Sequence, residues 1–384
     1  MRLRRLLLPL LALALVGAAA PAAHAGPYSR ANAALKREAN RLLSMTNGPP
    51  GLSITIHRGR RKVFIYGGTK VVGTKRRWGT SDHMRLASVS KAYSGAVILR
   101  LVERRQLSLD DTIGQRLPSL PAAWHRVTLR QALNHTSGLP NYTADPDLQA
   151  FLNRDPHGFV APDKILDFVR DKPLEFPPGS RYAYSNSDNI VAGLMAQQAT
   201  GRSYDRLLSR LVFSPLRLRR TSLQNSFQLP GPYVHGYDNS PGALSDDVST
   251  VLNMSFVWAA GAIQSTPLEL NRFMRAYGAT GLLGPRARRA QRRWVRGGNS
   301  EPPGPGRASA GLGLFQYRMK CGTVHGHTGN FPGYTQFAAV SPGGTRSVTV
   351  SINRQSDVAS GDPAVFSRLR RIYGLASCAA LARR

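Results

Sequence analysis

A serine and a lysine three positions apart, Ser88 and Lys91, have the spacing of a nucleophile and its base. A serine hydroxyl becomes a good nucleophile when a neighbouring group removes its proton. Because residues three apart in a helix lie on one face, the Lys91 amine can reach the Ser88 hydroxyl. Lys91 is the only one of eight lysines with a serine at this position. The pair predicts a serine hydrolase, although Ser-x-x-Lys alone is a weak motif.

A tyrosine and an asparagine, Tyr184 and Asn186, form the second candidate motif. A tyrosine hydroxyl can pass a proton to a leaving group, and an asparagine amide can orient a substrate carbonyl. The apolar run over residues 190–199 predicts a helix directly after this motif. The alternative motif, residues 237–239, lies among glycines and prolines that are typical of a loop.

The triplet His327-Thr328-Gly329 precedes a predicted strand and is the third candidate. Glycine allows a substrate backbone to approach an edge strand closely. The Thr328 hydroxyl and the His327 ring can contact an acyl or carboxylate group of a substrate. His325 adds a second imidazole, but no third ligand has suitable spacing, so we expect no metal site.

The elements that must position these motifs form a strand–helix–strand order along the chain. Alternating or apolar runs at residues 52–56 and 63–66 predict one hairpin, and residues 334–340 and 347–352 predict another. Helical periodicity predicts helices over residues 88–105 and 363–373, with shorter helices between about 110 and 280 and a loop at 300–310. This order predicts an α+β fold in which an antiparallel sheet from both termini is flanked by helices and carries an inserted, mainly helical lobe. The sheet lobe is expected at about 26–105 and 285–384, and the helical lobe at about 106–284.

The first 25 residues predict a secretory signal peptide that is cleaved near Ala25. Three arginines stand in the first five residues, residues 6–20 are mostly apolar, and Ala23-His24-Ala25 resembles a cleavage site. The apolar run is shorter than the roughly 20 residues of a membrane-spanning helix, so an N-terminal anchor is the weaker alternative. Residues 26–384 are therefore expected to be secreted or wall-associated, with no transmembrane segment.

Export also makes the two cysteines, Cys321 and Cys378, informative, because an oxidising compartment favours a disulfide between them over two buried thiols.

The chain of 384 residues is 42% hydrophobic, which excludes a disordered or a disulfide-dense small protein. Its 52 basic and 21 acidic residues give a net charge of +31. Arginine-rich coding or attraction to an anionic cell wall explains this charge. Nucleic acid is not an expected partner, because the arginines are scattered and the chain is expected to be exported.

The three motifs, in this order, resemble the serine β-lactamase and penicillin-binding D,D-peptidase family in its class C-like branch. The resemblance covers about residues 30–375 and is carried by residues 85–91, 133–139, 178–186 and 326–329. It implies that Ser88 is the acylated nucleophile, that Lys91 helps to deprotonate it and that Tyr184 is a general acid and base.

The same resemblance implies roles for the substrate-binding residues. Asn186 would contact the substrate amide, and the backbone N–H groups of Ser88 and Asn330 would form the oxyanion hole. His327, Thr328 and Gly329 would line the strand along which the substrate binds. The family uses no metal and no organic cofactor, and a monomer is expected.

Within this branch the chain is most similar to secreted actinobacterial D-alanyl-D-alanine carboxypeptidases. These enzymes also have histidine at the first position of the triplet and cysteines matching Cys321 and Cys378. The similarity implies peptidoglycan stem peptides as substrates. One departure is that Phe315, not arginine, follows the Gly-Leu-Gly-Leu run at 311–314, and Arg318 is displaced. A β-lactamase, an esterase, a D-aminopeptidase or D-amino-acid amidase, and an inactive penicillin- or wall-binding protein therefore stay open as alternatives.

Overall fold

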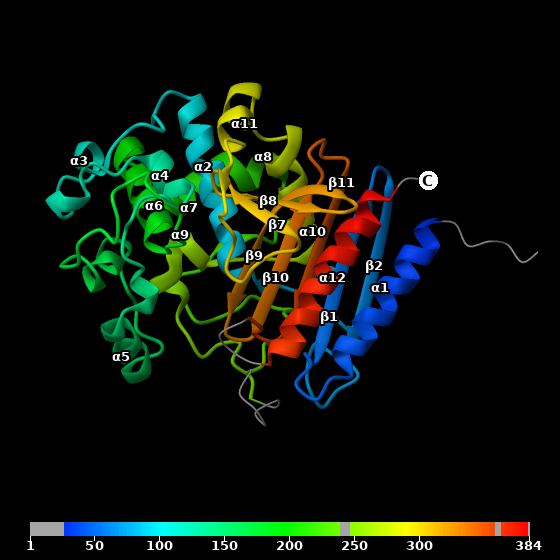
Figure 1. The fold of residues 1–384 in the computed structure, drawn as a ribbon. Coiled ribbons are helices and arrows are strands. Elements are labelled where there is room, and N and C mark those ends of the chain that lie inside the picture. The colour runs from blue at the N-terminus through cyan, green and yellow to red at the C-terminus, as the bar shows by residue number, and fades with distance from the viewer. Residues whose placement is uncertain (1–26, 239–245, 358–361, 383–384) are drawn as a thin grey trace, which may run out of the picture.

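The computed structural model describes residues 27–238, 246–357 and 362–382, drawn in colour in Figure 1. The expected signal peptide lies outside the described residues, as does Asn239 of the alternative tyrosine motif. Within the described ranges, each helix is too short or too polar to cross a bilayer.

One antiparallel sheet of eight strands forms the frame of the molecule, and both ends of the chain contribute to it. The pairing of Leu52 with Ile352 places an N-terminal strand beside a C-terminal one, as the sequence predicts. The strands follow one another across the sheet in this order: β2 (Arg61–Gly68), β1 (Gly51–Arg58), β11 (Arg346–Ile352), β10 (Tyr334–Val340), β9 (Gly322–Phe331), β8 (Phe315–Met319), β7 (Arg307–Ala310) and β6 (Val295–Arg296).

The sheet is covered on both faces, so β10 is buried throughout and β11 is buried except at Arg346. Helices α1 (Pro27–Leu43) and α12 (Pro363–Leu381) lie side by side on one face, as Figure 1 shows. Alternation along β10 divides its side chains, with Phe337 packed toward these two helices and Ala338 in the opposite core. The second core belongs to the helical insertion.

The insertion between β2 and β6 is mainly helical and is built around α2 (Ser90–Glu103). Nearly every residue of α2 is buried, because helices pack around it on several sides. A small sheet of β3 (Met84–Arg85), β5 (Ile263–Ser265) and β4 (Ser222–Leu223) holds the chain entering it. The other helices are α3 (Ile113–Arg116), α4 (Leu129–Leu133), α5 (Pro146–Arg154), α6 (Ser187–Thr200), α7 (Tyr204–Leu208), α8 (Ser214–Leu216), α9 (Trp258–Gly261), α10 (Pro267–Arg275) and α11 (Pro285–Gln291).

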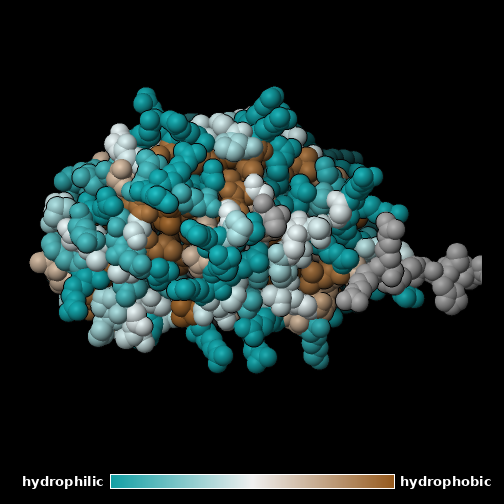
Figure 2. All heavy atoms as spheres, turned by 90° about the horizontal axis from the view of Figure 1, so that it is seen from above, coloured by the Kyte–Doolittle hydropathy of each residue, from teal (hydrophilic) through white to brown (hydrophobic). Residues whose placement is uncertain are grey.

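The predicted loop at 300–310 is partly wrong, because its last four residues are the strand β7, paired along its length with β8. Figure 2 shows one face on which hydrophilic side chains are spread over most of the surface and hydrophobic residues are visible in the recesses between them.

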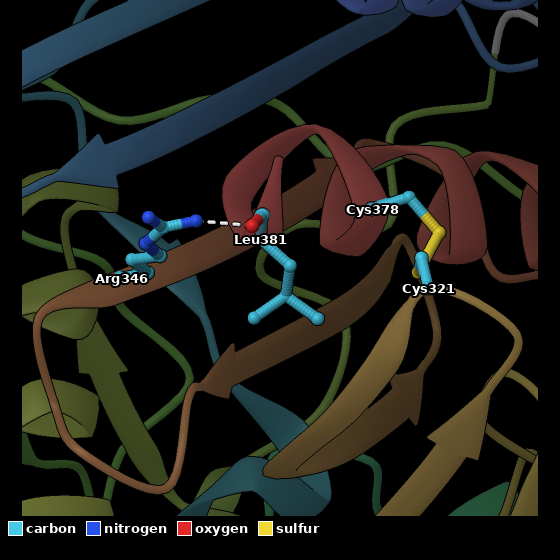
Figure 3. The surroundings of a disulfide bond; sticks show 4 residues. All are labelled: Cys321, Arg346, Cys378 and Leu381. Carbon is cyan, nitrogen blue, oxygen red and sulfur yellow. Dashed lines mark hydrogen bonds between the residues drawn. A yellow bond between two sulfur atoms is a disulfide. The ribbon is translucent and has the colours of Figure 1, made fainter. Parts of the chain in front are cut away.

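A disulfide between Cys321 and Cys378 joins the turn between β8 and β9 to α12, with 5.5 Å between the Cα atoms (Figure 3). This confirms the pairing expected from the sequence. The same helix is fastened at its end by Arg346, whose guanidinium donates hydrogen bonds to the carbonyls of Leu381 and Ala382. The bridge thus ties the outer helix layer to the strand pair that leads into the His-Thr-Gly triplet.

Reducing the Cys321–Cys378 bridge should lower the free energy of unfolding by about 2–4 kcal/mol, because the unfolded chain gains the freedom of a long loop. Urea unfolding with and without reductant measures this difference. A Cys321→Ser/Cys378→Ser variant is the control, and reductant should not change its unfolding midpoint. An unchanged midpoint on reduction of the native chain would contradict the stabilising role.

Candidate active site

Ser88 lies in a 3-10 turn, Ala87–Val89, that leads directly into α2. The turn is strained, since Ala87 has φ of 49°, a region that residues with a Cβ seldom occupy. Strand β9 passes very close to it. A Cβ on Gly329 would lie 2.4 Å from the carbonyl oxygen of Leu86 and 3.0 Å from the nitrogen of Ser88. Glycine is therefore required at position 329 for β9 to approach Ser88 this closely.

The Lys91 amine is fully buried and contacts three oxygen atoms from three parts of the chain. Its Nζ lies 3.0 Å from Ser88 Oγ, 2.7 Å from Asn186 Oδ1 and 2.9 Å from the carbonyl oxygen of Ala260. The amide oxygen of Asn186 and the carbonyl of Ala260 can only accept hydrogen bonds. A neutral amine gives its two N–H groups to them, and its lone pair then faces the Ser88 hydroxyl.

Burial lowers the pKa of Lys91 to about 7, while the negative charges of Glu301 and Asp188 act in the opposite direction. An amine with this pKa is substantially neutral near neutral pH and can accept a proton. The geometry and the pKa together make Lys91 a competent general base for Ser88.

The Tyr184 hydroxyl is buried and makes no hydrogen bond of standard geometry within the described residues. Burial raises the pKa of Tyr184, and its interaction with Ser88 partly offsets this rise. The Lys91 Nζ atom lies 5.1 Å from the centre of the tyrosine ring. A protonated phenol so placed can donate to a substrate atom bonded to the carbon that Ser88 attacks.

Asn186 is held in its orientation by two polar neighbours from the segment before α5. Its Nδ2 donates to Thr143 Oγ1 at 2.8 Å and to Asn141 Oδ1 at 3.2 Å, which leaves Oδ1 for Lys91. Neither neighbour was singled out from the sequence, because neither belongs to a recognisable motif.

His135 supports Tyr184 from behind, with 4.5 Å between their ring centres. Its Nδ1 lies 2.7 Å from Asp188 Oδ2, and the hydroxyl of Ser137 donates to the other carboxyl oxygen. Burial, assisted by the Lys91 charge, lowers the pKa of His135 to about 3, so the imidazole is neutral. His135 and Ser137 thus give residues 133–139 a supporting role behind Tyr184, which the sequence alone did not indicate.

Of the triplet region, the structure brings Asn330 to the surface of the site and buries the two residues before Gly329. His327 and Thr328 have no exposed surface, and the Thr328 hydroxyl donates to the carbonyl of Pro302 at 2.5 Å. Burial lowers the pKa of His327, so its ring is neutral. Their contact with a substrate stays a prediction.

Ser88 lies where two cavities meet, of about 350 Å³ and about 500 Å³. Asn186 and Asn330 line both. Apolar side chains in the wall of the first cavity include Leu152, Leu252, Phe256, Val257 and Phe331. The wall of the second cavity includes Tyr184, Glu301 and Asp357, which do not line the first. No sequence motif indicates Glu301, which belongs to the segment predicted as a loop.

The alternative tyrosine, Tyr237, is separated from this site. It is buried, and its hydroxyl accepts a hydrogen bond from the backbone N–H of Val72 at 2.7 Å.

Among the residues that the structure covers, no group of three or more His, Cys, Asp or Glu side chains is arranged to hold a metal ion. The site as built can transfer an acyl group to Ser88 by means of its own side chains.

Several solved structures share this architecture. A D-stereospecific amidohydrolase from a Streptomyces species is 27% identical, with a TM-score of 0.75, over 88% of this chain and 98% of the other. A D-amino acid amidase from Ochrobactrum anthropi SV3 is 21% identical, with a TM-score of 0.77, over 91% and 99%. The similarity to the D-amino acid amidase shows a shared fold alone.

Similar sequences include penicillin-binding protein 4* of Bacillus subtilis, 27% identical over 274 residues, and a D-aminopeptidase of Brucella anthropi, 29% identical over 177 residues. The matched parts are 68% and 46% of this chain, but only 58% and 33% of those relatives. The chain matches the Beta-lactamase family over residues 39–369, and it belongs to that family of serine acyl-transferring hydrolases.

Proposed function

We propose that this protein hydrolyses amide or peptide bonds next to a D-configured residue, through an acyl-enzyme on Ser88. The observation that carries the proposal is the contact of 3.0 Å between the buried Lys91 amine and the Ser88 hydroxyl. The D-configuration is supported by the similarity to an amidohydrolase and an aminopeptidase whose names state it.

The proposed reaction has two steps. Lys91 takes the proton of Ser88 as Oγ attacks the substrate carbonyl, and the oxyanion is stabilised by the N–H groups of Ser88 and Asn330. Tyr184 then protonates the leaving amine, the carbon–nitrogen bond breaks, and an ester remains on Ser88; the proton held by Lys91 passes to Tyr184, which resets both groups. In the second step Lys91 takes one proton from a water molecule as its oxygen attacks the ester, and that proton passes to Ser88 Oγ as the acid is released.

One specific form of the proposal is the D-alanyl-D-alanine carboxypeptidase that the sequence resemblance favours, acting on peptidoglycan stem peptides. Such a substrate ends in a carboxylate, which needs a cation near the leaving group. Among the described residues lining the two cavities, none is Arg, Lys or His. Phe315 is buried against His327, and the exposed Arg318 donates to Gln316. These observations favour a second form, which removes ammonia or another amine from a D-amino acid amide.

Turnover of four substrates separates these forms: a peptide ending in D-Ala-D-Ala, a D-amino acid amide, nitrocefin and a p-nitrophenyl ester. We expect the amide of the D-residue to be hydrolysed and its L-isomer to be resistant. Ser88→Ala should lower kcat by at least about 10³-fold and abolish labelling by a fluorescent penicillin, because the nucleophile is lost. Labelling or turnover that survives in this variant would remove Ser88 from the mechanism.

The activity should depend on the protonation state of Lys91. Its base form dominates above a pKa of about 7, so kcat/KM should rise as the pH increases through about 7. Lys91→Arg replaces the amine with a group that stays protonated, and it should lose most activity at every pH. The pH profile of kcat/KM measures this. A flat profile between pH 6 and pH 8 (about one unit either side of that pKa) would contradict the assignment.

We also propose that the enzyme acts outside the cytoplasm, as a secreted or wall-associated protein. The signal-like N-terminus and the disulfide support this location. N-terminal sequencing of the protein from the culture medium of its host should give a chain that begins at Gly26. A chain that keeps Met1 and stays in the cytosol would refute it.

A further inference from the structure

Glu301 is a carboxylate in the cleft that contains Ser88. It lines the same cavity as Ser88 and Tyr184, and its side chain is exposed to that cavity. Within the described residues it forms no hydrogen bond and no ion pair, although it lies close enough to Lys91 for their charges to interact. The other carboxylate of this cavity, Asp357, accepts a hydrogen bond from the amide of Asn330.

The cavity that holds Glu301 is where the leaving group must depart. Tyr184, whose phenol can protonate the leaving amine, lines this cavity and not the other one. Proton donation requires the amine nitrogen to lie within hydrogen-bond distance of that phenol. The substituent on the nitrogen therefore extends toward Glu301, and the acyl group has the other cavity available to it, with Leu152, Phe256 and Phe331 in its wall.

A free carboxylate on that substituent would face Glu301 and Asp357, and none of the described residues that line this cavity is Arg, Lys or His. Like charges in one cavity repel each other, and the partly enclosed cleft screens them less than open solvent does. An ammonium group at the same place would be attracted, and a neutral amine would experience neither effect.

We propose that Glu301 determines the charge of the leaving group, so that the enzyme prefers amides of neutral or cationic amines and discriminates against a terminal D-amino acid carboxylate. This inference rests on the proposed function and specifies its substrate class. It assigns to Glu301 a specificity-determining role, separate from bond cleavage. Partial burial and Asp357 raise the pKa of Glu301 while Lys91 lowers it, so the discrimination should weaken in acid as the carboxyl group becomes protonated.

Three acetyl-D-alanyl amides test the inference, because they share one acyl group and differ in the charge of the amine that leaves. The amines are ethylamine, which gives a neutral substituent, 1,2-diaminoethane, which gives a cation, and D-alanine, which gives an anion. In the native enzyme, kcat/KM should be lowest for the D-alanine compound. Glu301→Gln should raise it for that compound by about 10-fold, lower it for the cation by about 10-fold and leave the neutral amide nearly unchanged.

Asp163→Asn is the matched control, since it removes one negative charge from an exposed position that lines neither cavity. It should not change the order of the three substrates. Measurement at high salt separates the effect of Glu301 from attraction of anions to the basic surface, because salt screens the surface charges more strongly. Glu301→Ala serves as a second variant, and thermal unfolding shows whether each variant is folded.

The outcomes are distinguishable. Hydrolysis of the neutral amide together with equal effects of Glu301→Gln on all three substrates would overturn the role of Glu301 and leave the proposed function intact. Preference of the native enzyme for the D-alanine compound would do the same. No hydrolysis of any of the three would overturn the proposed function, and the inference with it.

Discussion

The burial of one amine, that of Lys91, is the interaction on which the rest of the site depends. An ionisable group inside a protein is stable only when its hydrogen-bonding atoms are satisfied and its charge is compensated or lost. Here the turn before α2, the start of α6 and the carbonyl of Ala260 each supply one oxygen atom. The contacts that satisfy the amine also orient it toward the nucleophile. The apolar environment of α2 is therefore a requirement of the chemistry as well as of the fold, because it lowers the pKa of the amine.

The sheet contributes by bringing β9 against the turn that holds Ser88. The close approach at Gly329 and the positive φ of Ala87 belong to one arrangement, in which two backbone segments meet at Ser88. Such strain persists only where the surroundings fix it. Strands from both ends of the chain, two covering helices and the Cys321–Cys378 bridge provide that rigidity on the sheet side. The helical insertion provides it on the other side, through α2.

Local features of the site could be predicted from the sequence, and features that depend on distant contacts could not. The spacing of Ser88 and Lys91 specifies a helix face, and the hairpins follow from alternation. The sequence favours Tyr184 over Tyr237 because a predicted helix follows it, and the fold adds that the hydroxyl of Tyr237 accepts a hydrogen bond from the backbone of Val72. The contact of Lys91 with the backbone carbonyl of Ala260 could not be predicted, because no side chain of Ala260 takes part in it. The hydroxyl of Thr328, which was expected to contact the substrate, donates a hydrogen bond to the carbonyl of Pro302 instead. Pro302 belongs to the segment that was predicted as a loop, so the sequence did not indicate this contact.

The charge of the chain illustrates the same limit at a larger scale. A net charge of +31 describes the field at a distance, where it favours approach to anionic surfaces. At physiological salt, charges more than about 8 Å away are largely screened, so the groups nearest to the cleft determine its electrostatic potential. Those groups are the Lys91 amine, which burial tends to neutralise, and the carboxylates of Glu301 and Asp357. A strongly basic protein can therefore have a cavity lined by carboxylates beside Ser88, so its composition predicts the surfaces that attract it but not the groups that line its cavities.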